Sequence, residues 1–108
     1  MPRNFANTVS RDYRVVDGTE TVTLTQGATV TTITKADAHD LTVREIAGAG
    51  GMWAMGDRRW GLGAAQVPSP PLGGQTITDI AGVVWSLIGD ATIDDLGISW
   101  FCVTRRAR

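Results

Sequence analysis

Residues whose chemistry could support catalysis or metal binding are few and scattered in this chain of 108 residues. Its one histidine, His39, lies between Asp37 and Asp40, a spacing that would suit a metal site or an acid–base pair. A zinc site needs at least three protein ligands, and one histidine with two aspartates in a turn is more typical of a solvated corner. Asp94 and Asp95 are adjacent, so on a strand they would face opposite ways. We interpret both groups as solvated and predict no metal site.

Candidates for a nucleophile or a phosphate-binding loop are equally weak. Cys102 is the single cysteine, which excludes an intramolecular disulfide, and its neighbours Phe101 and Val103 favour a buried small hydrophobe. None of the serines lies in a G-x-S-x-G motif. The glycines of residues 48–56 lack the strand–loop–helix setting and the G-K-[ST] of a phosphate-binding loop. We therefore expect no enzymatic activity and no cofactor.

Composition narrows the class of protein further. Ten Lys and Arg residues against eleven Asp and Glu give a formal net charge of -1, which argues against a dedicated nucleic-acid binder. The sequence lacks the apolar core of a signal peptide and any apolar run of 18 residues. We expect a soluble protein made in the cytoplasm, with no membrane contact.

The segment from Met52 to Trp60 is the first candidate for contacts with other molecules. One interpretation is that Trp53 and Trp60 cap the core. The other is that a glycine-hinged hairpin carries apolar side chains to a neighbouring subunit, because tryptophan and arginine are enriched at interface hot spots. The candidate interface residues are Met52, Trp53, Met55, Arg58, Arg59 and Trp60.

The basic C-terminal residues are the second candidate. Arg105, Arg106 and Arg108 would form either a solvated, frayed tail over residues 105–108 or an arm. Such an arm would contact an acidic neighbour or DNA, with a modest, salt-sensitive attraction to phosphates.

Most of the elements that would position these residues are predicted as short strands. Residues 1–11 are polar and unpatterned, which predicts an N-terminal arm, and Asp17-Gly18 predicts a hairpin turn. Thr21–Thr25 alternates as a half-buried strand. Residues 28–35 predict the next strand, with a bulge at Thr31-Thr32 because Val30 and Ile33 are three apart.

The second half continues the pattern. Residues 41–46 favour a strand with Leu41 and Val43 on one face over a short helix capped by Asp40. Gly56-Asp57 predicts a turn between strands 52–55 and 58–62. Residues 66–75 predict an irregular proline loop.

Residues 76–89 form a hairpin turning at residues 79–82, and residues 98–104 form a central strand. The pattern predicts one all-β domain over residues 1–108. It would be a barrel or sandwich of about seven short antiparallel strands with long loops.

Residues 42–104 resemble small proteins encoded among the head and neck genes of tailed bacteriophages. Three motifs carry the resemblance: D-x-R-W-x-L, G-x-x-I-x-D-x-x-G-x-x-W-x-V and W-x-C. This chain departs from the pattern at the last position of the second motif, where Leu87 replaces valine, and in its extended N-terminal arm. The matching residues are Asp57, Arg59, Trp60, Leu62, Gly74, Ile77, Asp79, Gly82, Trp85, Trp100 and Cys102.

The resemblance implies a virion structural protein of the head–tail connector (neck), either a head-closure (stopper) or a head–tail adaptor protein. Such a protein would form a homo-oligomeric ring, hexameric or dodecameric, that contacts the portal or adaptor above and the tail below. A stopper would also retain packaged DNA without reading its sequence. A tail terminator, a minor capsid protein and a decoration protein are alternatives within the virion. The alternative from another class is a monomeric β-barrel that binds a carbohydrate or small ligand by stacking on Trp53 or Trp60.

Overall fold

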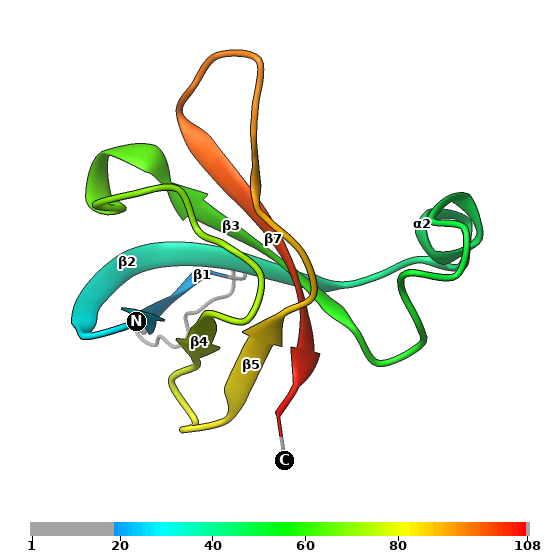
Figure 1. Ribbon diagram of the computed structural model, residues 1–108, viewed down its shortest axis with the longest axis horizontal. Coiled ribbons are helices and arrows are strands. Elements are labelled where there is room, and N and C mark those ends of the chain that lie inside the picture. Colours follow the sequence, from blue (N-terminus) through cyan, green and yellow to red (C-terminus); the bar gives the residue numbers. More distant parts are fainter. Residues whose placement is uncertain (1–18, 108) are drawn as a thin grey trace, which may run out of the picture.

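A computed structural model describes residues 19–107, which form an all-β barrel with a short helix to one side (Figure 1). The predicted arm (residues 1–11), the Asp17-Gly18 turn and Arg108 lie outside the described residues. The elements are β1 (Thr19–Gln26), β2 (Thr29–Asp40), α2 (Val43–Gly48), β3 (Arg58–Gly63), the 3-10 turn η1 (Ala64–Gln66), β4 (Thr76–Thr78), β5 (Val84–Leu87), β6 (Thr92–Ile93) and β7 (Ser99–Arg106).

Six antiparallel strands close into a barrel, and β6 is added to one edge of β7. The order around the barrel is β1-β2-β3-β7-β5-β4, and the β3–β7 pairing closes it. Strand β7 pairs with β3 along one edge and with β6 and then β5 along the other. The predicted all-β barrel and its central last strand are confirmed.

The barrel interior is filled by side chains that alternate inward along each strand. Trp60 and Trp85 meet edge to face, with ring centroids 6.4 Å apart. The Trp60 Nε1–H donates to Thr104 Oγ1 (3.1 Å), and the Thr104 hydroxyl donates to the Arg58 carbonyl (3.0 Å), so these two buried side chains have partners for their polar atoms. The core consists of Val22, Leu24, Ile33, Ala36, Trp60, Leu62, Ile77, Trp85, Leu87 and Cys102.

The β1–β2 hairpin contains its bulge three residues later than predicted. Val30 is 65% exposed and Ile33 is buried, so alternation is regular through Thr31-Thr32. The register shifts between Ile33 and Ala36, where Thr34 and Lys35 together oppose one residue of β1. Lys35 has a φ of 56°, a left-handed conformation that suits a bulge. The prediction was wrong because it assumed that Val30 faces inward.

The predicted strand over residues 41–46 is instead the beginning of helix α2. Thr42 caps it: the Glu45 amide donates to Thr42 Oγ1 (3.1 Å), and the Thr42 amide donates to Glu45 Oε1 (2.8 Å). This capping box satisfies two amides that a helix start leaves unpaired. Leu41 is buried and Val43 is exposed, so they do not share a face.

Residues 52–55 form no strand, so the predicted hairpin at Gly56-Asp57 is wrong. Strand β3 is paired on both edges, with β2 and with β7, which leaves no edge for a partner at residues 52–55. The segment between α2 and β3 instead consists of turns.

The hairpin of β4 and β5 is formed as predicted. Asp79 Oδ1 accepts hydrogen bonds from the amides of Ala81 and Val83 (both 2.9 Å), and its Oδ2 accepts from Trp85 Nε1–H (3.1 Å). Gly82 has a φ of 87°, which residues with a Cβ rarely adopt. One carboxylate thus ties the turn to a core tryptophan.

Candidate functional site

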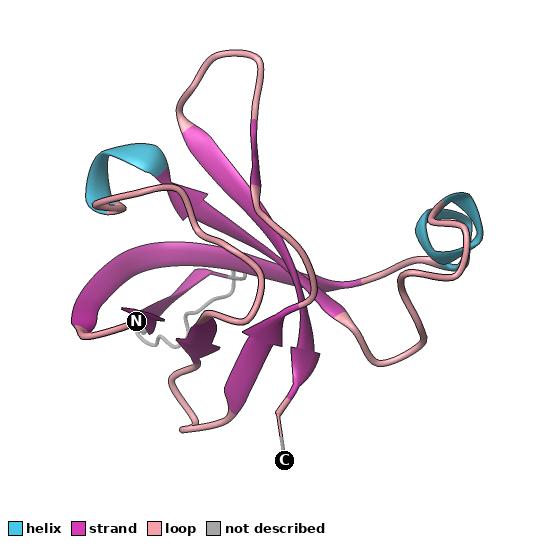
Figure 2. Cartoon of the chain, in the orientation of Figure 1, coloured by secondary structure: helices cyan, strands magenta, loops and turns pink. Residues whose placement is uncertain are grey.

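Residues 41–57, here called the α2 extension, leave the barrel after β2 and return to it at β3. Figures 1 and 2 show helix α2 standing off to one side of the barrel, away from η1. Three of its apolar side chains are largely open to solvent: Val43 (74% exposed), Met52 (57%) and Met55 (75%). The extension therefore presents apolar surface on a projecting segment.

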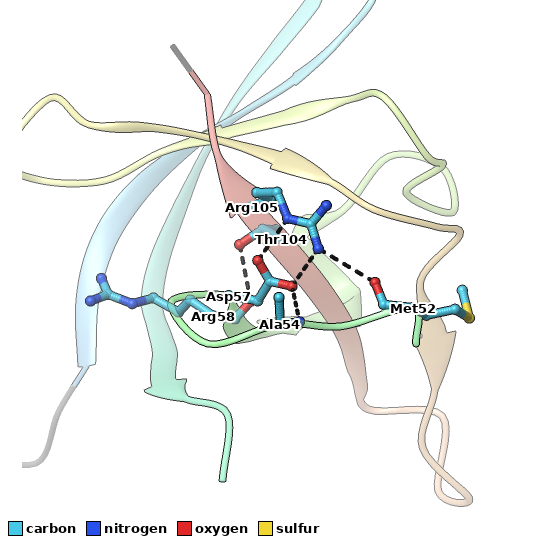
Figure 3. A network of polar contacts seen from close by, with 6 residues as sticks. All are labelled: Met52, Ala54, Asp57, Arg58, Thr104 and Arg105. Carbon is cyan, nitrogen blue, oxygen red and sulfur yellow. Dashed lines mark hydrogen bonds and ion pairs between the residues drawn. The ribbon is translucent and has the colours of Figure 1, made fainter. Parts of the chain in front are cut away.

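A two-pronged ion pair fixes the base of the extension to the last strand (Figure 3). The Arg105 Nε–H donates to Asp57 Oδ1 and its Nη2–H to Asp57 Oδ2, both at 2.9 Å. Asp57 is 2% exposed, and its Oδ2 also accepts from the Ala54 amide (2.8 Å). Arg105 Nη2–H reaches on to the Met52 carbonyl at 3.4 Å. Side-chain and backbone groups of the extension are thus held by one arginine from β7.

This environment favours the charged form of Asp57. The hydrogen bonds from the Arg105 guanidinium lower the pKa of the Asp57 carboxyl below its ordinary value. The amide of Ala54 lowers that pKa further, and burial opposes both effects without reversing them.

A second attachment lies at the start of α2, around Glu45. Its Oε2 lies 3.6 Å from His39 Nε2 on β2 and 3.5 Å from Arg59 Nη1 on β3. The Arg59 guanidinium in turn lies 4.1 Å from the centroid of Phe101 on β7. The hydrogen bond from the Thr42 amide is the main cause that lowers the pKa of Glu45. The helix start is therefore connected to three strands of the barrel.

A cavity of about 360 Å³ lies between the α2 extension and the barrel wall. A second cavity of about 140 Å³ shares Arg59 and Phe101 with it, and together we call them the extension groove. The first is lined by Glu45, Met52, Trp53, Arg59, Gly89, Asp90, Thr92, Phe101 and Val103, and the second by Asp37, His39, Arg59, Gly61 and Phe101.

The predicted interface residues separate into three environments. Met52 and Met55 are exposed on the extension, and Trp53 is half-buried against the groove. Trp60 has no exposed surface, so the structure corrects its assignment to an interface: its side chain belongs to the core. The segment from Met52 to Trp60 had two interpretations, capping the core or contacting a neighbouring subunit. The first applies to Trp60 and not to Trp53.

The two arginines before Trp60 are engaged on the barrel wall. Arg58 lies 4.5 Å from the Trp85 ring centroid and pairs with Asp40 through its Nε (3.3 Å). Arg59 lies on Phe101 in the groove, as described above. Stacking on aromatic rings suits the planar guanidinium.

The predicted basic tail is partly strand. Arg105 and Arg106 belong to β7, which corrects the expected frayed end at these two positions. Arg105 binds Asp57, whereas Arg106 is exposed opposite Trp85 of β5. Among the described arginines of the tail, Arg106 therefore has an accessible side chain and no ion pair, unlike Arg105.

The structure shows where the weaker chemical candidates, Asp94, Asp95 and Cys102, lie. Asp94 Oδ1 accepts from the Ile98 amide (2.9 Å) and so closes the β6–β7 turn, while Asp95 is exposed. Cys102 is fully buried, and burial raises the pKa of its thiol to about 12.

Within residues 19–107 no three His, Cys, Asp or Glu side chains gather closely enough to hold a metal ion. No helix in that part of the chain is long and apolar enough to cross a membrane.

Two residues that organise this site were not among the predicted site residues. The sequence indicates Asp57 only as a turn residue and as part of a motif, and its partner Arg105 lies 48 positions away, so no local signal indicates the pair. Glu45 could have been found, because Thr42 and Glu45 form the T-x-x-E pattern of a capping box.

No protein-family model matches this sequence, and no curated protein matches it either. The fold is similar to the solution structure of protein SF1141 from Shigella flexneri 2a, solved by the Northeast Structural Genomics Consortium. The TM-score is 0.62 at 15% sequence identity, and the match covers 83% of this chain and 95% of the other. At this identity the likeness shows a shared fold.

Proposed function

We propose that this protein is a structural subunit of the head–tail connector of a tailed bacteriophage. It would act as a head-completion or stopper ring protein that joins the portal or adaptor to the tail and retains packaged DNA. The observation that carries the proposal is the α2 extension, an apolar, projecting segment anchored at both ends to a closed barrel. The motif resemblance of residues 42–104 supplies the class of assembly.

A ring subunit needs one surface that meets a different surface on its neighbour. The extension suits that role because its base is rigid and its apolar side chains are exposed. Val43, Met52 and Met55 would gain most from burial in such a contact, at about 25 cal/mol per Å² of apolar area removed from water. The near-neutral net charge avoids strong repulsion between copies.

The DNA-retaining part of the proposal rests on fewer residues. Arg106 is exposed at the end of β7 and Arg108 follows it in the sequence. In a ring these side chains repeat in every subunit, so a modest attraction per copy would add up along the channel.

A second candidate function is supported by the extension groove. Its larger cavity, about 360 Å³, falls in the size range of small-ligand sites, and Trp53 and Phe101 offer aromatic faces there. This candidate is a monomer that binds a carbohydrate or another small ligand.

Peptide mass spectrometry of purified virions, followed by imaging of the neck, tests the proposal. The expected result is a ring of this protein between portal and tail. Absence from virions, together with a monomer in sedimentation, would overturn it. Ligand-dependent change in tryptophan fluorescence would then favour the second candidate.

A further inference from the structure

We propose that residues 1–11 bind in the extension groove of their own chain. This inference does not depend on the proposed function. It rests on where the described chain begins, on the charges and apolar side chains of the groove, and on the composition of the segment.

The chain that precedes β1 joins the barrel at the edge of the groove. Thr19, the first described residue, pairs with Asp37 of β2, and Asp37 lines the smaller cavity. Asp37 is paired across the sheet with Gly61, which is paired with Phe101, so Phe101 on the groove floor is three strand spacings, about 14 Å, from Thr19. Residue 11 is eight residues before Thr19, and eight extended residues span about 28 Å. The segment therefore reaches the whole groove from its own chain.

The groove is acidic as well as apolar. Asp37, Glu45 and Asp90 contribute three carboxylates to its lining against one guanidinium, that of Arg59. Arg59 is already paired with Glu45, and among residues 19–107 neither Asp37 nor Asp90 forms an ion pair. Asp90 Oδ1 accepts a hydrogen bond from the Gly73 amide (2.9 Å), which orients the carboxylate, and no described cation pairs with it.

Residues 1–11 have the complementary composition. They contain Arg3 and Arg11 and no acidic residue. Between the two arginines lie Phe5 and Val9, which suit the apolar lining of the groove. The lining residues that would contact them are Met52, Trp53, Phe101 and Val103.

Because residues 1–11 are tethered to the groove by their own chain, even a weak complementarity is sufficient for binding. A segment joined to its site by a short connection has an effective concentration in the millimolar range. At low protein concentration it therefore outcompetes the same segment from a second copy. Residues 1–11 would cover the aromatic side chains that the groove leaves accessible.

The test uses the full chain with a nitroxide spin label on an Asn7→Cys variant, read by amide NMR signals. Cys102 is fully buried, so the label attaches at position 7. The expected result is loss of amide peak intensity at Trp53, Gly89 and Phe101. An Ala28→Cys label, in the exposed turn at the other end of β2, is the matched control and should leave these peaks unchanged. Undiminished groove peaks with the label at position 7 would overturn the proposal.

Two further arms identify the occupant. Arg3→Glu with Arg11→Glu, added to the labelled chain, should restore the groove peaks; persistent broadening would contradict the electrostatic basis of the proposal. In a second experiment, spin-labelled copies without isotope are mixed with isotope-labelled copies that carry no spin label. The groove peaks of the isotope-labelled copies should then show no broadening. Broadening in that mixture would mean that a second copy supplies the segment, and the own-chain proposal would be wrong. None of these results depends on whether the protein is found in virions.

Discussion

The aspartates of the two longer motifs each tie a segment of irregular backbone to the barrel frame. Asp57 binds Arg105 and the Ala54 amide, and Asp79 binds its own turn and the indole of Trp85. Trp60 and Cys102 lie in the core. The motifs therefore specify the barrel and its anchors, whereas the exposed side chains of the extension lie outside them.

Replacing Asp57 with asparagine should lower the free energy of unfolding by about 2 kcal/mol at pH 7, because a buried, hydrogen-bonded charge is lost. The folded pKa of Asp57 is depressed, so its contribution is complete above the ordinary aspartate value of 3.8 and is lost as pH falls through the folded pKa. Urea unfolding of both proteins should therefore show a gap at pH 7 that shrinks below about pH 4.

The exposed Asp95 offers a control for that experiment, since Asp95→Asn should change stability little at either pH. Equal destabilisation by the two substitutions would show that the Asp57–Arg105 pair contributes nothing specific.

Cys102 should not react with thiol reagents in the folded protein. It has no exposed surface, and burial raises the pKa of its thiol to about 12, so the reactive thiolate is scarce. Iodoacetamide labelling followed by intact mass should give no adduct at neutral pH and complete labelling in denaturant. Rapid labelling without denaturant would mean that β7 opens readily.

Among the elements, helix α2 depends most on its attachments. It has six residues, fewer than an isolated helix needs to be stable in water. The capping box at Thr42 and the contacts of Glu45 with His39 and Arg59 provide the stabilisation that so short a helix lacks by itself.

Replacing Thr42 with alanine should destabilise α2 locally by about 1 kcal/mol, the usual cost of losing an N-cap side chain. Hydrogen exchange should quicken at the amides of Ile46, which donates to the Thr42 carbonyl, and Ala49, which donates to the Ile46 carbonyl, while the core strands stay protected. Thr32→Ala, on the exposed face of β2, is the matched control. Unchanged exchange at Ile46 would show that the barrel contacts alone hold the helix.

Elements with strong local signals were predictable from the sequence. The residue 79–82 turn and the alternation of β1 and β7 each indicate a unique local structure, and each was confirmed. The strand predicted over residues 41–46 is wrong because Leu41 and Val43 mimic strand alternation, whereas the T-x-x-E pattern of Thr42 and Glu45 indicates a helix start. The Asp57–Arg105 pair was beyond local reasoning, because it depends on the register that places Arg58 opposite Thr104.

At the scale of the whole molecule, closure of the barrel separates structural side chains from contact side chains. Every core residue lies on a barrel strand, while Met52 and Met55 lie on the extension and contribute nothing to the core. Substitutions there can alter assembly and leave the barrel intact.

The double substitution Met52→Gln and Met55→Gln should leave the thermal midpoint nearly unchanged and abolish ring formation, because it removes the apolar area that a neighbour would cover. Native mass spectrometry and incorporation into virions measure the outcome. Ile80→Gln is the matched control, since Ile80 is equally exposed on the β4–β5 turn. Rings that form normally with both methionines replaced would exclude the extension from the subunit contact.

Strand β7 follows every strand that it pairs with along the chain, and this order has a consequence during synthesis. Until β7 emerges from the ribosome, β3 lacks its second partner and β5 has one free edge. The β3–β7 pairing joins residues about 40 positions apart, a non-local contact that forms slowly. Nascent chains that end before Ser99 would therefore carry unpaired strand edges that can pair with one another and aggregate. These edges are covered only once β7 is available to close the barrel.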